Sequence, residues 1–161
     1  MNDIQRLLRN YNNNFLIFNE ITEYVKIEYL NFDKIILVTD ENLSNLIKIN
    51  EVINFFKNKY NTKIIELSSG EPNYEVIERT SKNIFAERCD LVIALGGGSI
   101  LDTVKAASMY ENSIENVDHF SGSKKQYTQR LVKTLAIPTT AGTGSEYTHT
   151  SVYKTRLNIK N

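Results

Sequence analysis

Largely apolar runs that alternate with segments of helical length constrain the fold of this chain more than any other feature of its sequence. Such runs are typical of strands covered on both faces of a parallel sheet. Strands are expected at Phe15–Phe18, Ile35–Thr39, Lys63–Leu67, Leu91–Leu95 and Thr134–Ile137. The alternation predicts an α/β fold of the Rossmann-like, doubly wound type, with a mainly parallel sheet and helices on both faces.

Three helices are expected between these strands, because apolar residues recur there at the spacing of one helix face. The positions that form these faces are Leu43, Leu46, Ile47, Val52, Ile53 and Phe56, then Tyr74, Val76, Ile77, Ser81, Ile84 and Phe85, and then Ile100, Leu101, Val104, Ala107 and Ser108. The polar stretch Tyr110–Arg130 is expected to form a long surface connection, and Thr148–Tyr153 has the composition of one more strand.

Length and charge limit the class of protein. The 161 residues, 41% of them hydrophobic, are enough for one ordinary core, so we expect a single domain over residues 1–161. Nineteen basic and 19 acidic residues balance, which favours a small-molecule partner over nucleic acid or a membrane surface. The single cysteine and the lack of any apolar stretch of about 18 residues predict a cytoplasmic protein.

A glycine run directly follows the strand Leu91–Leu95. Gly96, Gly97 and Gly98 lead into Ser99, where the third helix is expected to begin. Without a Cβ, backbone N–H groups can close around an anion, and the N-terminus of a helix favours negative charge. The run lies where ligands collect in doubly wound sheets, although it does not match G-x-G-x-x-G. It predicts a phosphate-binding loop, with a plain tight turn as the alternative.

A second loop, Pro138–Glu146, follows the last strand. Its hydroxyl side chains and its two glycines suit contact with a ribose, a phosphate or an amide. The alternative is a capped turn in which Thr143 or Ser145 begins a short helix, and both interpretations can hold at once. The hydroxyl residues are Thr139, Thr140, Thr143 and Ser145.

Charged residues accompany both loops. Asp102 and Lys105 share one face of the third helix, and are either a solvated ion pair or part of the ligand site. Asp40 ends the strand Ile35–Thr39, where a carboxylate either accepts ribose hydroxyls or forms an Asx turn or a helix N-cap. His119 and His149 have no partner at ligand spacing, so no metal site is predicted.

The two loops together closely resemble the iron-containing alcohol dehydrogenase family. The resemblance rests on Gly96-Gly97-Gly98-Ser99 with Asp102 and Lys105, and on Pro138–Glu146. It implies that Gly97, Gly98 and Ser99 hold the pyrophosphate of a dinucleotide. It also implies that Thr139 and Thr140 lie along its adenosine half, that Thr143 and Ser145 approach the nicotinamide, and that Asp102 and Lys105 support that end.

The same resemblance implies a cofactor and a reaction. Asp40 would favour NAD over NADP, and His149 and Thr150 would border the substrate cleft. In that family a hydride passes between an alcohol or aldehyde and nicotinamide, with a divalent metal, Fe or Zn, held by a helical domain that follows this region. We therefore expect a truncated N-terminal NAD-binding domain that lacks its metal ligands.

Two alternatives to this expectation remain open. In one, the chain is a free-standing nucleotide-binding module without redox activity. In the other, it is the partner of a separate helical subunit. A missing helical domain would expose apolar surface near Ile100, Ala141 and Val152, so a homo-oligomer is expected.

Overall fold

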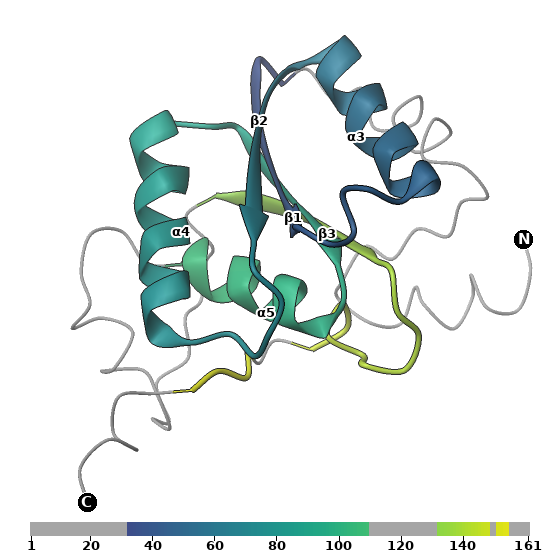
Figure 1. Cartoon of the computed structure of the whole chain (residues 1–161). Coiled ribbons are helices and arrows are strands. Elements are labelled where there is room, and N and C mark those ends of the chain that lie inside the picture. Colours follow the sequence, from purple (N-terminus) through teal and green to yellow (C-terminus); the bar gives the residue numbers. More distant parts are fainter. Residues whose placement is uncertain (1–31, 110–131, 149–150, 155–161) are drawn as a thin grey trace, which may run out of the picture. The chain divides into compact units, whose positions relative to one another are not determined.

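The computed structural model of the chain describes residues 32–109, 132–148 and 151–154 (Figure 1). The expected strand Phe15–Phe18, the connection Tyr110–Arg130 and the candidates His149 and Thr150 lie outside these residues. The described elements are β1 (Lys34–Asp40), α3 (Ile47–Lys59), β2 (Asn61–Leu67), α4 (Tyr74–Glu87), β3 (Leu91–Gly96), α5 (Gly98–Ala107) and β4 (Lys133–Pro138).

The described strands form one parallel sheet in the order β2-β1-β3-β4. The two central strands, β1 and β3, are almost fully buried, as their continuous apolar sequences predict. The edge strands β2 and β4 keep several exposed positions. All four strands lie within two residues of the predicted ranges, so the expected parallel sheet is confirmed.

Helices cover both faces of this sheet. One core packs Ile36 and Val38 of β1 with apolar residues of α4 and α5. The neighbouring residues Ile35 and Leu37 are also fully buried, and alternation along a strand directs them to the opposite face. Figure 1 shows α4 and α5 on one side of the strands and α3 on the other. The doubly wound architecture is therefore confirmed.

Helices α4 and α5 lie close to their predicted positions. The side chain of Asn73 caps α4, since its Oδ1 accepts a hydrogen bond of 2.9 Å from the N–H of Val76. Helix α4 ends at Arg88, which adopts the left-handed conformation with φ 48°. Helix α5 begins one residue before Ser99 and is buried at every position from Ile100 to Ala107.

The expected apolar face of the first helix is partly wrong. Helix α3 begins at Ile47, and Leu46 is 53% exposed while Ile47 is 79% exposed. After β1 the chain first turns, because the carbonyl of Asp40 accepts hydrogen bonds from the N–H groups of Leu43 and Ser44. Only Ile53 and Phe56, further along the helix, are buried.

Two further expectations need correction, one for the C-terminal strand and one for the exposed apolar surface. Ser151–Tyr153 form no strand, and only Lys154 pairs, in an isolated bridge with Asn73. Ile100 is not an exposed apolar residue, because its side chain packs in the core and is 5% exposed. Ala141 is exposed and Val152 is 73% exposed, as expected.

Candidate functional site

The site is built at the edge of the sheet where the parallel strands end. The register pairs Thr39 with Leu95 and Gly96 with Pro138, so the segments that follow β1, β3 and β4 emerge side by side. Among the described strands, the connections change direction between β1 and β3, since β2 lies on one side and β4 on the other. In open α/β sheets ligands bind in the crevice at such a switch point.

The glycine run lies at this edge and begins α5. Gly97 is the N-cap of the helix, and its carbonyl accepts hydrogen bonds from Ile100 and Leu101. No side chain caps this end of α5. The first N–H groups of a helix have no partner inside it, so those of Gly98 and Ser99 are available to an anionic ligand.

The second loop packs directly against the glycine run. The N–H of Thr139 donates a hydrogen bond of 3.0 Å to the carbonyl of Gly96. A Cβ added at Gly97 would lie 3.2 Å from Thr140 Oγ1, and one added at Gly98 would lie 3.2 Å from Ser145 Oγ and from Thr143 Cβ. The two sequence motifs, about 40 residues apart, therefore form one continuous surface.

The second loop contains a turn but no helix. The N–H of Tyr147 donates 2.9 Å to the carbonyl of Gly144, and Ser145–Tyr147 form a turn. Gly142 and Gly144 have φ angles of 97° and 63°, which side chains rarely adopt. The alternative of a short helix capped by Thr143 or Ser145 is therefore wrong for the described residues.

Two buried oxygens of the second loop suit an external partner. Thr139 Oγ1 and Glu146 Oε2 are shielded from solvent and form no hydrogen bond with any other described residue. Buried polar atoms in proteins are almost always hydrogen-bonded. Thr139 Oγ1, at the edge of the sheet where the glycine run begins, therefore has hydrogen-bonding capacity left for a hydroxyl or phosphate group of a ligand.

Asp40 lies beside the glycine run, at the end of the adjacent strand β1. Its Oδ1 accepts a hydrogen bond of 2.8 Å from the N–H of Asn42, which is the Asx turn considered above. Its Oδ2 accepts one of 2.8 Å from the hydroxyl of Ser69, which follows β2. Each carboxylate oxygen has further lone pairs, so the Asx turn does not prevent Asp40 from accepting ligand hydroxyls.

Asp102 and Lys105 are not a solvated surface pair. Lys105 Nζ lies 2.7 Å from Asp102 Oδ1, and each side chain is only 11% exposed. The pair is enclosed because the segments around Ser145 and Val152 lie over α5 and form hydrogen bonds to it. The interpretation as a solvated ion pair is therefore wrong, and a part for the pair in the ligand site stays a prediction.

Sequence reasoning missed several residues that support the site. Ser69 orients Asp40, and Thr148 and Ser151 form hydrogen bonds to α5. Their local sequence carries no signal for these contacts, since each partner lies at least 29 residues away in the chain. The place of Ser69 two residues after the expected strand Lys63–Leu67 puts it at the same edge of the sheet, but does not indicate Asp40 as its partner.

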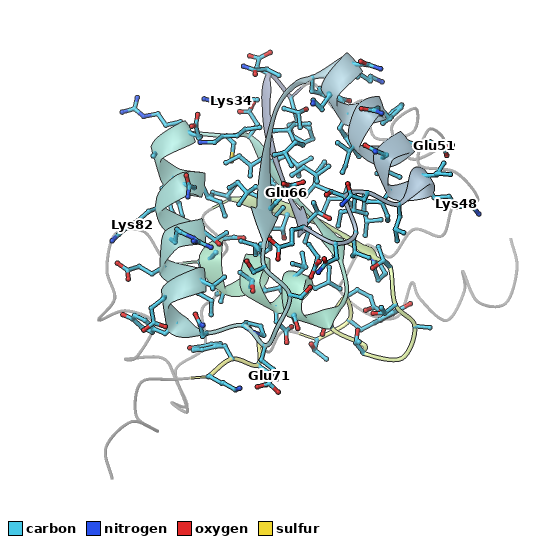
Figure 2. All side chains as sticks on the ribbon, viewed as in Figure 1. Lys34, Lys48, Glu51, Glu66, Glu71 and Lys82 are labelled. Atoms are coloured by element: carbon cyan, nitrogen blue, oxygen red, sulfur yellow. The ribbon has the colours of Figure 1, made fainter. Side chains whose placement is uncertain are left out.

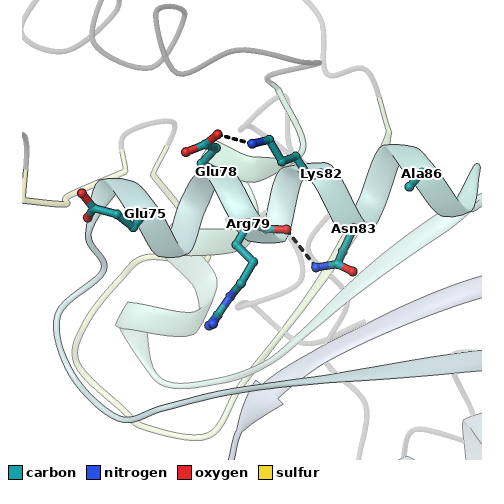
Figure 3. Close-up of a pocket in the computed structure, with 6 residues that line it drawn as sticks. All are labelled: Glu75, Glu78, Arg79, Lys82, Asn83 and Ala86. Atoms are coloured by element: carbon teal, nitrogen blue, oxygen red, sulfur yellow. Dashed lines mark hydrogen bonds and ion pairs between the residues drawn. The ribbon is translucent and has the colours of Figure 1, made fainter.

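One pocket lies away from this edge and differs from the candidate site. The pocket in Figure 3 is formed by one side of α4 alone, from Glu75 to Ala86, and two of its side chains, Glu78 and Lys82, pair with each other. No group of three His, Cys, Asp or Glu among the described residues could hold a metal ion. None of the described helices is long and apolar enough to cross a membrane.

Comparison with known proteins agrees with this geometry. Residues 3–161 match the family model described as iron-containing alcohol dehydrogenase. The mitochondrial hydroxyacid-oxoacid transhydrogenase of Xenopus laevis is 36% identical over 127 residues, which cover 73% of this chain and 27% of that protein. An alcohol dehydrogenase of Thermococcus barophilus is 33% identical over 114 residues, which cover 66% of this chain and 30% of that protein.

Solved structures show the same fold. A sulfoacetaldehyde reductase from Bifidobacterium kashiwanohense, crystallised in complex with NAD+, aligns with a TM-score of 0.69 and 26% identity. The alignment covers 86% of this chain and 36% of that one. The archaeal alcohol dehydrogenase ADH/D1 aligns with a TM-score of 0.67 and 27% identity, over 77% of this chain and 34% of that one. The chain thus spans about a third or less of these relatives.

Proposed function

Because this chain belongs to the iron-containing alcohol dehydrogenase family, we propose that it forms the NAD-binding part of an enzyme that transfers hydride between nicotinamide and an alcohol or aldehyde. The observation that carries this proposal is the close approach of Gly98 to Thr143 and Ser145, since a Cβ added at Gly98 would lie 3.2 Å from both residues. That close approach joins an uncapped helix N-terminus and a hydroxyl-rich loop at one edge of the sheet, next to Asp40.

The described residues divide the work of binding among them. The N–H groups of Gly97, Gly98 and Ser99 hold the pyrophosphate, and the N-terminus of α5 adds its favourable dipole. The hydroxyls of Thr139 and Thr140 lie along the adenosine half. Thr143 and Ser145 contact the nicotinamide half, where the bound cofactor exchanges a hydride with the substrate carbon.

Asp40 gives the site its preference for NAD over NADP. A carboxylate on the strand next to the glycine run accepts the two hydroxyls of the adenosine ribose and repels a 2′-phosphate. The Asx turn and the Ser69 hydroxyl hold this carboxylate in place without using all of its lone pairs. The NAD+ complex of the similar sulfoacetaldehyde reductase supports the choice of cofactor.

The family's divalent metal does not fit the described residues. They contain no group of three potential ligands, so no step at a metal is assigned to them. Likewise, His149 and Thr150 lie outside the described residues, and their place at the substrate cleft stays a prediction. A metal-dependent reaction would need Fe or Zn ligands from residues other than these.

The identity of the substrate separates two candidate activities. A small alcohol or aldehyde follows from the family and from the similar alcohol dehydrogenases. The second candidate activity is hydride exchange between a hydroxyacid and an oxoacid. It is favoured by the transhydrogenases among the relatives. A cytoplasmic location and self-association are further proposals, although several relatives are named as mitochondrial.

Titration with NADH tests the proposal. We expect the fluorescence of NADH to rise saturably when the chain is added, and ADP-ribose to reverse the rise by competition. Absence of any binding would contradict the proposal. A second assay uses the protein encoded by the longest natural reading frame, supplied with Fe or Zn. If NADH binds to the chain but this protein reduces neither a small aldehyde nor an oxoacid, the chain is a nucleotide-binding module without redox activity.

A further inference from the structure

A buried ion pair joins α5 to the second loop. Asp102 and Lys105 lie one turn apart on α5, and their residues are 8% and 9% exposed. A pair at this spacing on a helix surface contributes little, and burying two charges costs solvation free energy. A buried pair therefore needs compensating hydrogen bonds, and those hydrogen bonds show what the pair holds.

Lys105 holds the second loop. Its Nζ donates a hydrogen bond of 2.9 Å to the carbonyl of Ser145 and one of 3.1 Å to Thr148 Oγ1. The carbonyl of Thr148 lies 3.5 Å from the same ammonium group. Ser145 lies near the end of the loop and Thr148 lies two residues after the loop, and two of the three acceptors are backbone atoms, so Lys105 fixes the path of the chain as it leaves the loop.

Asp102 holds the segment that comes next in the chain. Its Oδ2 accepts a hydrogen bond of 3.1 Å from the N–H of Val152, while its Oδ1 faces Lys105. Its backbone carbonyl accepts another, of 2.7 Å, from the hydroxyl of Ser151. The two charges thus attach the chain to α5 at Ser145 and Thr148, and again at Ser151 and Val152.

These contacts reach the candidate cofactor site through Ser145. Lys105 fixes the carbonyl of this residue, and its hydroxyl faces Gly98 in the glycine run. Both side chains of the ion pair are already committed to protein partners. We propose that Asp102 and Lys105 are positioning residues, which set the distance between the second loop and the glycine run, rather than residues that touch the cofactor.

This proposal rests on the proposed function, and its test separates positioning from stability. Lys105→Met removes the donor and leaves the Asp102 carboxylate buried without its counter-charge, which lowers stability as well. The double variant Asp102→Asn with Lys105→Met removes both charges, so we expect most of the lost thermal stability to return. We expect NADH affinity to stay at least about tenfold weaker in the double variant, because the loop still lacks its anchor.

Hydrogen exchange supplies a second readout. Amides of residues 139–148 should exchange faster in both variants, whereas β1 and α4 should keep wild-type rates in the double variant. Recovery of NADH affinity together with stability would show that the pair acts only on folding, and would overturn the proposal. A weaker affinity with unchanged exchange in residues 139–148 would also overturn it, because that result indicates direct contact with the cofactor.

Lys82→Met is the matched control. Lys82 forms an ion pair with Glu78 on the outer side of α4, and its side chain is 63% exposed (Figure 2). We expect this substitution to change neither NADH affinity nor exchange in the loop. If the wild-type chain itself binds no NADH, the proposed function fails and the positioning role with it. Faster exchange at residues 139–148 would then support only a structural anchor.

Discussion

Asp40 shows how one carboxylate can satisfy two interpretations. The Asx turn with Asn42 is formed, so the local interpretation of this residue is confirmed. Its position beside the glycine run is also as the cofactor interpretation requires. The structure adds Ser69, whose hydroxyl donates to Asp40 Oδ2 and accepts a hydrogen bond of 2.6 Å from Asn42 Nδ2. The orientation of the carboxylate is thus fixed from two sides.

Ser69→Ala tests this arrangement through cofactor selectivity. We expect the preference for NADH over NADPH to fall about threefold, because the Asp40 carboxylate keeps its charge but gains freedom to rotate. Asp40→Asn should lower the preference by at least about tenfold, since the repulsion of a 2′-phosphate is lost. The ratio of the two dissociation constants is the measurement, because a general loss of structure weakens both cofactors together.

Ser44→Ala is the matched control for this prediction. Ser44 is a nearby serine whose hydroxyl donates a hydrogen bond of 2.9 Å to the carbonyl of Glu41, whereas its backbone N–H, which alanine keeps, donates to the carbonyl of Asp40. We expect its selectivity to equal that of the wild type. Equal loss of affinity for NADH and NADPH in Ser69→Ala would argue against an orienting role.

The glycines of the first loop differ in what they allow. A Cβ at Gly96 would lie 2.7 Å from Ile100 Cγ1, inside the core, whereas one at Gly98 would lie between the two loops. We expect Gly96→Ala to lower the free energy of unfolding by about 1–3 kcal/mol, as overpacking does. We expect Gly98→Ala to lower it less, but to weaken NADH binding about tenfold by pushing Thr143 and Ser145 away.

Urea denaturation and NADH titration of both variants separate these effects. The two variants serve as controls for each other, because the same methyl group is added two residues apart. A Gly98→Ala protein with wild-type affinity would contradict the close contact of the two loops at the cofactor site. A Gly96→Ala protein of wild-type stability would contradict the packing of Ile100 against β3.

At the scale of elements, Glu87 connects three segments at the edge of the sheet opposite the site. Its Oε2 lies 2.5 Å from Lys34 Nζ at the start of β1, and its Oε1 lies 2.6 Å from Lys63 Nζ on β2. Glu87 itself lies at the end of α4. Hydrogen bonds from Lys34, then from Lys63, and the attraction of their charges lower the pKa of Glu87 from its ordinary 4.5 to about 2.

This shift predicts how Glu87→Gln changes stability with pH. A lowered pKa in the folded state means that the unfolded chain takes up a proton first as the pH falls. The ion pairs therefore contribute their full stability above about pH 4.5, and the contribution disappears as the pH falls toward 2. We expect Glu87→Gln to melt at a lower temperature than the wild type at pH 7, with the difference shrinking between pH 4.5 and 2.

Thermal melts at a series of pH values measure this difference. Glu78→Gln is the control, because Glu78 pairs with a single lysine on α4 and connects no other element. We expect its melting temperature at pH 7 to lie closer to that of the wild type. A Glu87→Gln difference that stayed constant down to pH 2 would contradict a role for the two lysines.

The elements themselves follow from local sequence. Strand β3 and the middle of strand β1, Ile35–Val38, are apolar without interruption, as strands covered by helices on both faces are, and this pattern is readable without a structure. Helix α3 was harder to predict, because the spacing of Leu43 and Leu46 continues the helical pattern into a turn. The hydrogen bonds of the Asp40 carbonyl end that pattern, and periodicity alone does not reveal them.

For the whole molecule, the two loops were predictable as motifs, each at the end of a strand. Parallel strands place their following loops at one edge of the sheet, and the structure shows how close they come, since a Cβ added at Gly97 would lie 3.2 Å from Thr140 Oγ1. That both loops bind a dinucleotide is a prediction from the resemblance to a family, and the family match confirms the family alone. The individual roles of Thr139, Thr140, Thr143 and Ser145 stay predictions until binding to each variant is measured.

Local pattern was sufficient for the parallel sheet, for α4 and α5, and for the place of the glycine run, because these depend on periodicity and on residues close in the chain. The tertiary structure decided the burial of Asp102 and Lys105. Charge and spacing alone favoured a solvated pair, since an ion pair on an arbitrary helix faces water. The pair Asp102 and Lys105 is enclosed by residues that lie 40 or more positions away in the chain, namely Ser145, Thr148 and Val152. Packing between such distant segments leaves no trace in the sequence around the pair.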